Sequence, residues 1–241
     1  MWTVTITRSK RLLLQDIYVN STSSNTYPAR NTDGCNTMFS DKITLRRWKI
    51  KNGDDCIATK ANSTNILIED MEFHDGQVVA IGSIGQYKGN FETIENVTVR
   101  NVVAYGSRYV GRIKTWTGEQ IGYPPNGGGG GLGYVKNLSW DNVTIYEGTQ
   151  PPIYVMQCIT YNGVTGNCST SLLDISDISF TNFRGTLEGK RVAYLQCSRS
   201  HGGCDNVRIE NMDLTNVSVD PPVAATEYRC SNVNSPIGFT C

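Results

Sequence analysis

The sequence predicts an all-β protein, folded as a parallel β-helix in a single domain over residues 1–241. Three observations predict this fold: a short apolar–polar alternation recurs along the chain, no stretch has a clear 3.6-residue apolar period, and 39% of the residues are hydrophobic. Strands alternate with a period of two residues. Repeated short strands without helices between them are expected to stack as coils around one core.

Each copy of the repeat contains two short apolar alternations, which an Asn, Asp or Arg interrupts in the middle. Two strands that meet at a corner give this pattern. The copies lie at residues 10–19, 42–50, 65–73, 96–104, 137–145, 177–185 and 206–214. A β-sandwich or a propeller is the alternative. A propeller blade needs four strands in about 40–50 residues, so the closely spaced copies at 42–50 and 65–73 argue against it.

Two steps between copies are long, from 96–104 to 137–145 and from there to 177–185. Extra residues must leave the stack as loops, and such loops can wall a binding cleft. The first loop contains five consecutive glycines at 127–131. A phosphate cradle would need the Walker lysine and a following helix, and neither is present. We therefore expect a flexible or closely packed loop.

Charge and hydropathy exclude several classes of protein. Lys plus Arg and Asp plus Glu are 22 each, without the basic excess that is typical of nucleic-acid binding. No apolar run is long enough to cross a bilayer. The sequence therefore predicts no nucleic-acid and no membrane partner, and a monomer is expected.

The eight cysteines predict disulfides. No CxxC occurs and there are only two histidines, so a structural zinc site is not expected. Pairing of sequence neighbours is the simplest arrangement, although spacing alone does not fix connectivity. It gives Cys35–Cys56, Cys158–Cys168, Cys197–Cys204 and Cys230–Cys241.

Sequons and cysteines together favour a secreted, extracellular glycoprotein. The N-x-S/T sequons begin at Asn20, Asn62, Asn96, Asn137, Asn142, Asn167 and Asn216. The N-terminus, however, lacks the basic region and apolar stretch of a signal peptide. We therefore expect that the true N-terminus is missing.

Three aspartates are expected to share one patch. Asp33 comes just before the copy at 42–50, and Asp54 and Asp55 come just after it, about one coil later. Adjacent parallel strands are about 4.7–4.9 Å apart, and carboxylates at that distance repel, so at least one should keep its proton near neutral pH. Such a split suits glycoside hydrolysis, in which one acid protonates the leaving oxygen and another group activates water. The structural alternative is a pair of Asp-rich turns.

Arg112 and Lys114 are expected to point the same way, because side chains alternate along a strand and Ile113 lies between them. If Ile113 is in the core, both cations face outward. They could then bind a uronic acid carboxylate, Arg112 in a bidentate way. The alternative is an ordinary solvated basic pair.

These motifs together resemble glycoside hydrolase family 28, the polygalacturonase family, whose fold is the pectin-lyase-like β-helix. The resemblance rests on Asn31-Thr32-Asp33, Gly53-Asp54-Asp55 and Arg112-Ile113-Lys114, in that order and spacing, and covers essentially the whole chain. Three segments look most like fungal exo-acting members: residues 81–87, 114–118 and 122–125 with the glycine run after it.

The resemblance implies a right-handed helix and inverting hydrolysis of α-linked galacturonic acid polymers, with no metal or other cofactor. Because family members carry several coils before the Asn-Thr-Asp segment, it also implies that N-terminal coils are missing here and that the chain is the C-terminal part of a longer catalytic domain, whose folding and activity depend on those coils. It implies that Asp54 is the general acid, while Asp33 and Asp55 hold and activate the water. Arg112 and Lys114 would bind the substrate carboxylate, and Tyr194 matches an aromatic residue beside the sugar. The usual Gly-His-Gly is here Gly76-Gln77-Val78, so Gln77 replaces the cleft histidine, as exo-type relatives often do.

Several functions remain open on the sequence. The leading interpretation is an exo-polygalacturonase that releases galacturonic acid from the non-reducing end of polygalacturonate. Exo-hydrolysis of rhamnogalacturonan, or release of rhamnose as an α-rhamnosidase, would use the same residues. A calcium-dependent pectate lyase can share the β-helix, and a truncated β-helix that binds pectin without cleaving it is the non-catalytic alternative. The exact glycan, the pH optimum and the sequons in use are not determined by the sequence.

Overall fold

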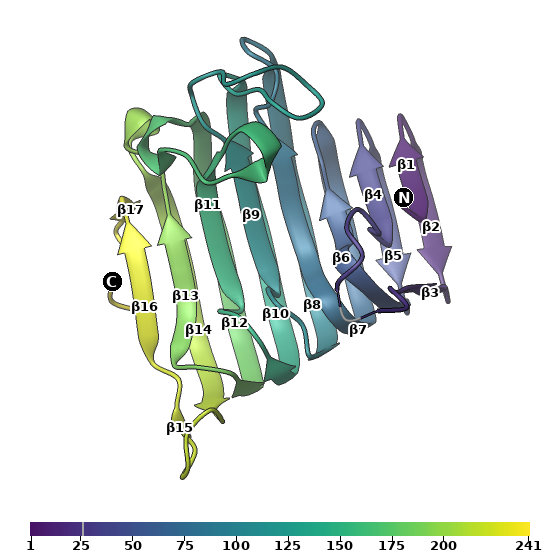
Figure 1. Ribbon diagram of the computed structural model, residues 1–241, viewed down its shortest axis with the longest axis vertical. Coiled ribbons are helices and arrows are strands. Elements are labelled where there is room, and N and C mark those ends of the chain that lie inside the picture. Colours follow the sequence, from purple (N-terminus) through teal and green to yellow (C-terminus); the bar gives the residue numbers. More distant parts are fainter. Residues whose placement is uncertain (26) are drawn as a thin grey trace.

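The computed structural model describes residues 1–25 and 27–241 and forms the predicted right-handed parallel β-helix. Figure 1 shows the coils stacked in chain order, with the N-terminus at the β1–β3 end and the C-terminus beside β16. Apart from β14 with β15, the paired strands run parallel. The parallel arrangement follows from the repeat, because each copy enters the stack in the same direction.

The described residues form seventeen strands and three short 3-10 helices, which loops and turns connect. The first strands are β1 (Val4–Thr7), β2 (Lys10–Gln15), β3 (Tyr18–Ser21), β4 (Cys35–Met38), β5 (Asp41–Arg46), β6 (Lys49–Thr59), β7 (Ser63–Ile84) and β8 (Phe91–Tyr105). They continue as β9 (Gly111–Trp116), β10 (Leu132–Gly148), β11 (Ile153–Ile159), β12 (Leu172–Leu187), β13 (Arg191–Gln196), β14 (Cys204–Asn216), β15 (Val223–Ala224), β16 (Glu227–Ser231) and β17 (Val233–Asn234). The helices are η1 (Tyr161–Gly163), η2 (Cys168–Thr170) and η3 (Arg199–His201). Within this part of the chain, no helix has the length and apolar character needed to cross a membrane.

One face of the helix, which we call the site sheet, contains β1, β4, β9, β11, β13, β16 and the C-terminal parts of β6 and β7. Its register is continuous: Ile57 pairs with Val79, Val79 with Gly111, and Gly111 with Ile153. Longer strands such as β10 and β12 bend through the other two faces. Residues far apart in sequence therefore occupy equivalent positions on the site sheet.

The polar residues that interrupt each repeat form the corners between strands. Asn96 and Asn101 in β8 have φ angles of 56° and 54°, and Asn137 and Asn142 in β10 have 55° and 54°. This left-handed conformation strains most residues, and Asn and Asp tolerate it best. The predicted corner in the middle of each copy, at Asn101 and Asn142, is confirmed, and Asn96 and Asn137, where the copies begin, have the same conformation.

Corner amides also bond from coil to coil. Asn96 donates Nδ2 to Asn65 Oδ1 at 3.2 Å, Asn137 donates to Asn96 at 3.1 Å, and Asn142 donates to Asn101 at 2.9 Å. Three of the predicted sequon asparagines are thus members of structural ladders. Stacked amides satisfy each other where the corners would otherwise leave polar groups without partners.

The inward side chains stack into one core. Trp140 and Phe180, on neighbouring coils, are fully buried and stack with ring centroids 4.7 Å apart, and Phe183 meets Phe180 edge-on at 6.2 Å. Each coil alone exposes its apolar residues, so burial requires the coils above and below. The core therefore fixes the register on which the site sheet depends.

The glycine run packs closely against the preceding loop. Gly129 donates its N–H to the carbonyl of Gln86 at 2.8 Å, and Gly131 donates to Gly85 at 3.1 Å. A Cβ at position 131 would lie 2.6 Å from the Gly85 backbone, so a side chain does not fit there. Of the two descriptions that the sequence allowed, close packing is correct.

Three of the four predicted disulfides are present, namely Cys158–Cys168, Cys197–Cys204 and Cys230–Cys241. The predicted Cys35–Cys56 bond is wrong, because both thiols are free and buried. The register pairs Cys35 with Ile57, so Cys56 is one residue out of step, and its sulfur lies 3.2 Å from the side-chain oxygen of Asn52. Burial raises the pKa of the Cys35 thiol to about 12 and also raises the pKa of Cys56.

Substitution of Phe180 by Ala should lower the free energy of unfolding by about 3–5 kcal/mol, because it leaves a cavity in the core. The control is Phe91→Ala, since Phe91 is 64% exposed, and its effect should stay within about 0.5 kcal/mol. Urea unfolding followed by tryptophan fluorescence measures both. Equal midpoints for the two variants would contradict the described core.

A thiol count tests the cysteine assignment. Without reductant, the native protein should react with no thiol reagent, because Cys35 and Cys56 are buried and their raised pKa values keep them protonated. After denaturation, two thiols per chain should react. A count of zero after denaturation would show that these two cysteines form a fourth disulfide.

Candidate active site

The predicted site residues converge on the site sheet. Asp33 lies two residues before β4, Asp54 and Asp55 lie in β6, Arg112 and Lys114 in β9, and Tyr194 in β13. Gln77 lies in β7, paired in register with Asp55. The structure therefore brings together on neighbouring coils the carboxyls and cations that the sequence singled out.

Backbone contacts hold the three aspartates. The Asp54 carboxyl accepts hydrogen bonds from the N–H of Asn31 at 2.7 Å and of Asp55 at 2.9 Å. The N–H of Gly34, next to Asp33, donates to the Asp55 carbonyl at 3.1 Å. Asp33 and Asp55 are 3% and 1% exposed, whereas Asp54 is only half-buried. Asp54 is thus the most accessible carboxyl of the three.

The surroundings move the pKa values of Asp33 and Asp55 in opposite directions. Burial, and next the charge of Asp55, raises the pKa of Asp33. For Asp55, burial acts to raise the pKa, but the charges of Lys114 and Arg112 and a hydrogen bond from Lys114 together outweigh it, so its pKa is lowered. The pKa of Asp33 is thus raised and the pKa of Asp55 is lowered, so Asp33 holds its proton more readily than Asp55.

Both predicted cations contact protein groups. Lys114 Nζ lies 2.6 Å from Asp55 Oδ2. Arg112 donates a hydrogen bond to the Gln77 side-chain oxygen and lies over the ring of Tyr109, 5.2 Å from its centroid. Gln77 is buried and accepts from a cation, so its amide orients Arg112 where a charged histidine would repel it.

An aromatic row extends from Arg112 along the site sheet. In register, Arg112 is followed by Tyr154, Tyr194 and Arg229 on successive strands. The rings of Tyr154 and Tyr194 are 5.5 Å apart, and Tyr109 lies 4.6 Å from Tyr154. Tyr194 is thus joined to the charged centre through Tyr154.

Sequence reasoning missed Tyr154 and Lys60. Ile153-Tyr154-Val155 shows the same alternation as Gly111-Arg112-Ile113, and that alternation could have placed Tyr154 on the outward face. Lys60 directly follows β6, and no repeat signal marks it. Its charge lowers the pKa values of both Asp33 and Asp55.

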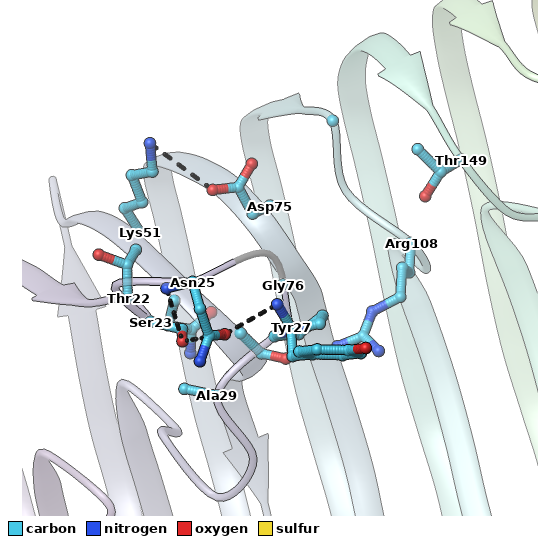
Figure 2. A pocket seen from close by; sticks show the side chains of 14 residues that line it. Thr22, Ser23, Asn25, Tyr27, Ala29, Lys51, Asp75, Gly76, Arg108 and Thr149 are labelled. Atoms are coloured by element: carbon cyan, nitrogen blue, oxygen red, sulfur yellow. Dashed lines mark hydrogen bonds and ion pairs between the residues drawn. The ribbon is translucent and has the colours of Figure 1, made fainter.

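A pocket lies beside the carboxyls and does not include them. It has a volume of about 510 Å³ and is lined by residues 22–23, 25 and 27–29, by Asn52–Gly53 of β6, by Asp75–Gly76 of β7, and by Gly106 and Arg108. In Figure 2 the Arg108 side chain reaches toward the Tyr27 ring, and Lys51 pairs with Asp75. Arg108 donates to the Gly53 carbonyl at 2.6 Å, directly before Asp54. This contact holds the backbone of β6 directly before Asp54.

Among residues 1–25 and 27–241, no three His, Cys, Asp or Glu side chains are grouped as they would be around a metal ion.

The family model of "Glycosyl hydrolases family 28" matches residues 1–241. The chain belongs to this family. It is 43% identical to an α-L-rhamnosidase of Aspergillus niger over 241 residues, which are 100% of this chain and 56% of that protein. An exopolygalacturonase of Cochliobolus carbonum is 35% identical over 96% of this chain and 51% of its own length. The chain thus spans about half the length of the curated relatives it matches.

Solved structures support the fold. The endo-xylogalacturonan hydrolase from Aspergillus tubingensis has a TM-score of 0.72 at 22% identity, over 96% of this chain and 58% of that one. Endopolygalacturonase I from Stereum purpureum has a TM-score of 0.61 at 20% identity, over 96% of this chain and 62% of that one. At these identities the likeness concerns the fold alone.

Replacement of Tyr154 by Ala should weaken binding of a pectic oligosaccharide. The change removes one ring of the row and its contacts with the rings of Tyr109 and Tyr194. A loss of about 1.4 kcal/mol of binding free energy corresponds to a tenfold increase in KM. Initial rates on polygalacturonate should show a rise in KM that exceeds the fall in kcat. Tyr146→Ala, in the exposed stack of Tyr105 and Tyr146 elsewhere on the helix, is the control. An unchanged KM for Tyr154→Ala would remove this row from the substrate path.

Proposed function

We propose that the protein is an inverting exo-glycosidase that releases galacturonic acid from the non-reducing end of polygalacturonate. The observation that carries the proposal is the cluster of three carboxyls beside two cations: half-buried Asp54 lies next to buried Asp33 and Asp55, and Lys114 holds Asp55. A family 28 glycosidase needs one carboxyl that gives a proton and another that activates water. The curated relatives include an exopolygalacturonase.

Accessibility and resemblance together assign the roles. Asp54 is the most exposed of the three carboxyls and donates the proton to the leaving oxygen. Asp55 Oδ2 is taken by Lys114, while Oδ1 is buried and accepts no hydrogen bond from the described residues. That oxygen is available to orient a water, and Asp33 removes the proton of the water once Asp33 is ionised.

Positive charge favours an acidic sugar. Arg112 and Lys114 lie beside the carboxyls on the outward face of β9. A uronate carboxylate would replace or share their present partners, with Arg112 as a bidentate donor. Exo action is attributed to the packed loops at residues 82–92 and 117–131, which rise beside the site sheet and would limit how far a polymer extends.

Release of rhamnose from rhamnogalacturonan is the second candidate. The specific observation that favours it is the 43% identity to an α-L-rhamnosidase along the full length of this chain. The same three aspartates would act, since the reaction at the glycosidic bond is the same. The terminal sugar is then neutral, so the cations would act on a neighbouring galacturonate.

We also propose that the protein is secreted, in keeping with its three disulfides. Asn20 is an exposed sequon site, whereas Asn216 is buried and its side-chain oxygen accepts from the N–H groups of Gly189 and Ser218. A glycan is therefore expected at Asn20 more than at Asn216. The proposed state is a monomer whose partner is the pectic polymer.

Product analysis tests the function. The purified protein is incubated with polygalacturonate and with rhamnogalacturonan, and products are separated by size over time. Galacturonic acid monomer from the first time point, with inversion at the anomeric carbon by NMR, is the expected result. Asp54→Asn should lower kcat at least a hundredfold, because general acid catalysis contributes about 10²–10⁴-fold.

Other outcomes assign other functions. Early mixed oligomers would exclude exo action, and rhamnose as the first product would establish the second candidate. Unsaturated products that require calcium would indicate a lyase. Binding of a folded protein to both polymers without cleavage would leave only the non-catalytic alternative.

A further inference from the structure

Lys60 lies on the same outward column of the site sheet as Lys114. Thr59 of β6 pairs with Ile81 of β7, and Ile81 pairs with Ile113 of β9. One residue further along each strand come Lys60, Gly82 and Lys114, of which Gly82 and Lys114 are paired in register. Adjacent parallel strands are about 4.8 Å apart. The backbones of the two lysines are therefore about 9.6 Å apart, with a glycine between them.

The Lys60 ammonium has no anionic partner of its own. Within the described residues, its nitrogen takes part in no ion pair or side-chain hydrogen bond, although Asp41, Glu69, Glu72 and Glu227 elsewhere on the helix each hold a cation. The ammonium lies 4.9 Å from the centroid of the Trp2 ring. Burial, and next the charge of Lys114, lowers the pKa of Lys60, against the charges of Asp55, Asp33 and Asp54. Such a cation gains more from an anionic ligand than a solvated one.

Gly82 keeps the space between the two lysines free of side chains. Its φ angle is +103°, a conformation that residues other than glycine rarely adopt, and a Cβ there would collide with the carbonyl oxygen of Lys114. No other residue fits at this position. The two ammonium groups therefore flank a gap of glycine backbone next to the catalytic aspartates.

We propose that Lys60 and Lys114, on either side of Gly82, form a subsite for the carboxylate of a galacturonate unit in the substrate. Lys114 also holds Asp55, so the carboxylate would lie between Lys60 and the ion pair of the site. This inference rests on the proposed function and names a further binding residue for it. It fits both candidate polymers, because each contains galacturonate.

The subsite also affects the acid–base groups. The charge of Lys60 lowers the pKa values of Asp33 and Asp55. If this charge is removed, both carboxyls ionise at higher pH. The acidic limb of the activity profile, where Asp33 must lose its proton, should then move to higher pH. A residue that only supported the fold would not move this limb.

Binding of trigalacturonate to a variant that does not cleave it tests the subsite independently of catalysis. The affinity for trigalacturonate is measured by calorimetry in the Asp54→Asn protein. The series compares this protein with the same protein that also carries Lys60→Met, Lys60→Arg or the control substitution Lys42→Met. Lys42 is an exposed residue of β5, outside the site sheet. Lys60→Met should weaken binding tenfold or more, Lys60→Arg should restore most of the loss, and Lys42→Met should have no effect.

The result that overturns the proposal is a change below twofold for Lys60→Met while the protein binds trigalacturonate and unfolds at the same temperature. If Lys60→Met unfolds, the comparison of Lys60→Arg with Lys60→Gln decides in the same assay: equal affinities would reject a role for the charge. In the cleaving protein, the defect of Lys60→Met should disappear on fully methyl-esterified polygalacturonate, whose carboxyl groups are neutral. A defect of the same size on both polymers would reject the subsite.

Failure of the proposed function gives a different result. A folded protein that cleaves neither polymer but binds trigalacturonate through Lys60 would reject the enzyme and retain the subsite. If the Lys60→Met variant cleaves polygalacturonate with the same KM and the same acidic limb of the pH profile as the unchanged protein, the enzyme is retained and the subsite is rejected.

Discussion

In-register hydrogen bonding between parallel strands of successive coils is the constraint on which the rest of the structure depends. It stacks Trp140 on Phe180 inside the helix and Arg112 on Tyr154 and Tyr194 outside it. A shift of one residue would turn every side chain of a strand to the opposite face. The same shift would place apolar residues in solvent and cations in the core. The register is therefore held by the core and exploited by the active site.

The polar side chains of this helix fall into two kinds: those that have protein partners, and those at the site sheet that lack some of them. Buried Glu69 is held by Arg46 from the coil before it and by Arg100 from the coil after it. The corner amides likewise bond to one another along the helix. At the site sheet the balance is incomplete: Asp33 has a raised pKa, and among the described residues Asp55 Oδ1 has no hydrogen-bond partner and the Lys60 ammonium has no ion-pair partner. Groups left in this state are those that a substrate can satisfy.

The relatives are named for the release of different sugars, and one arrangement of site residues is compatible with both reactions. In the proposed function, the three aspartates act on the glycosidic bond itself, whereas Arg112, Lys114 and the tyrosine row contact the sugars that flank it. A terminal galacturonate carries a carboxylate at C6, whereas a terminal rhamnose carries a methyl group there and has a different ring stereochemistry. The decision between them therefore lies in side chains around the carboxyls, and not in the carboxyls themselves.

The sequence by itself determined the repeat, the corners, the aspartate cluster and three disulfides, because each is a local pattern or links near neighbours. Asn and Asp at corner positions are readable because the left-handed backbone conformation selects them. Only the tertiary structure decided that Cys35 and Cys56 stay apart, that Lys60 and Tyr154 belong to the site, and that the glycine run packs against residues 85–92. These features depend on which residue of one coil lies above which residue of the next. Loops of unequal length separate the coils, so spacing along the chain gives that register only approximately, and the packing of the core fixes it.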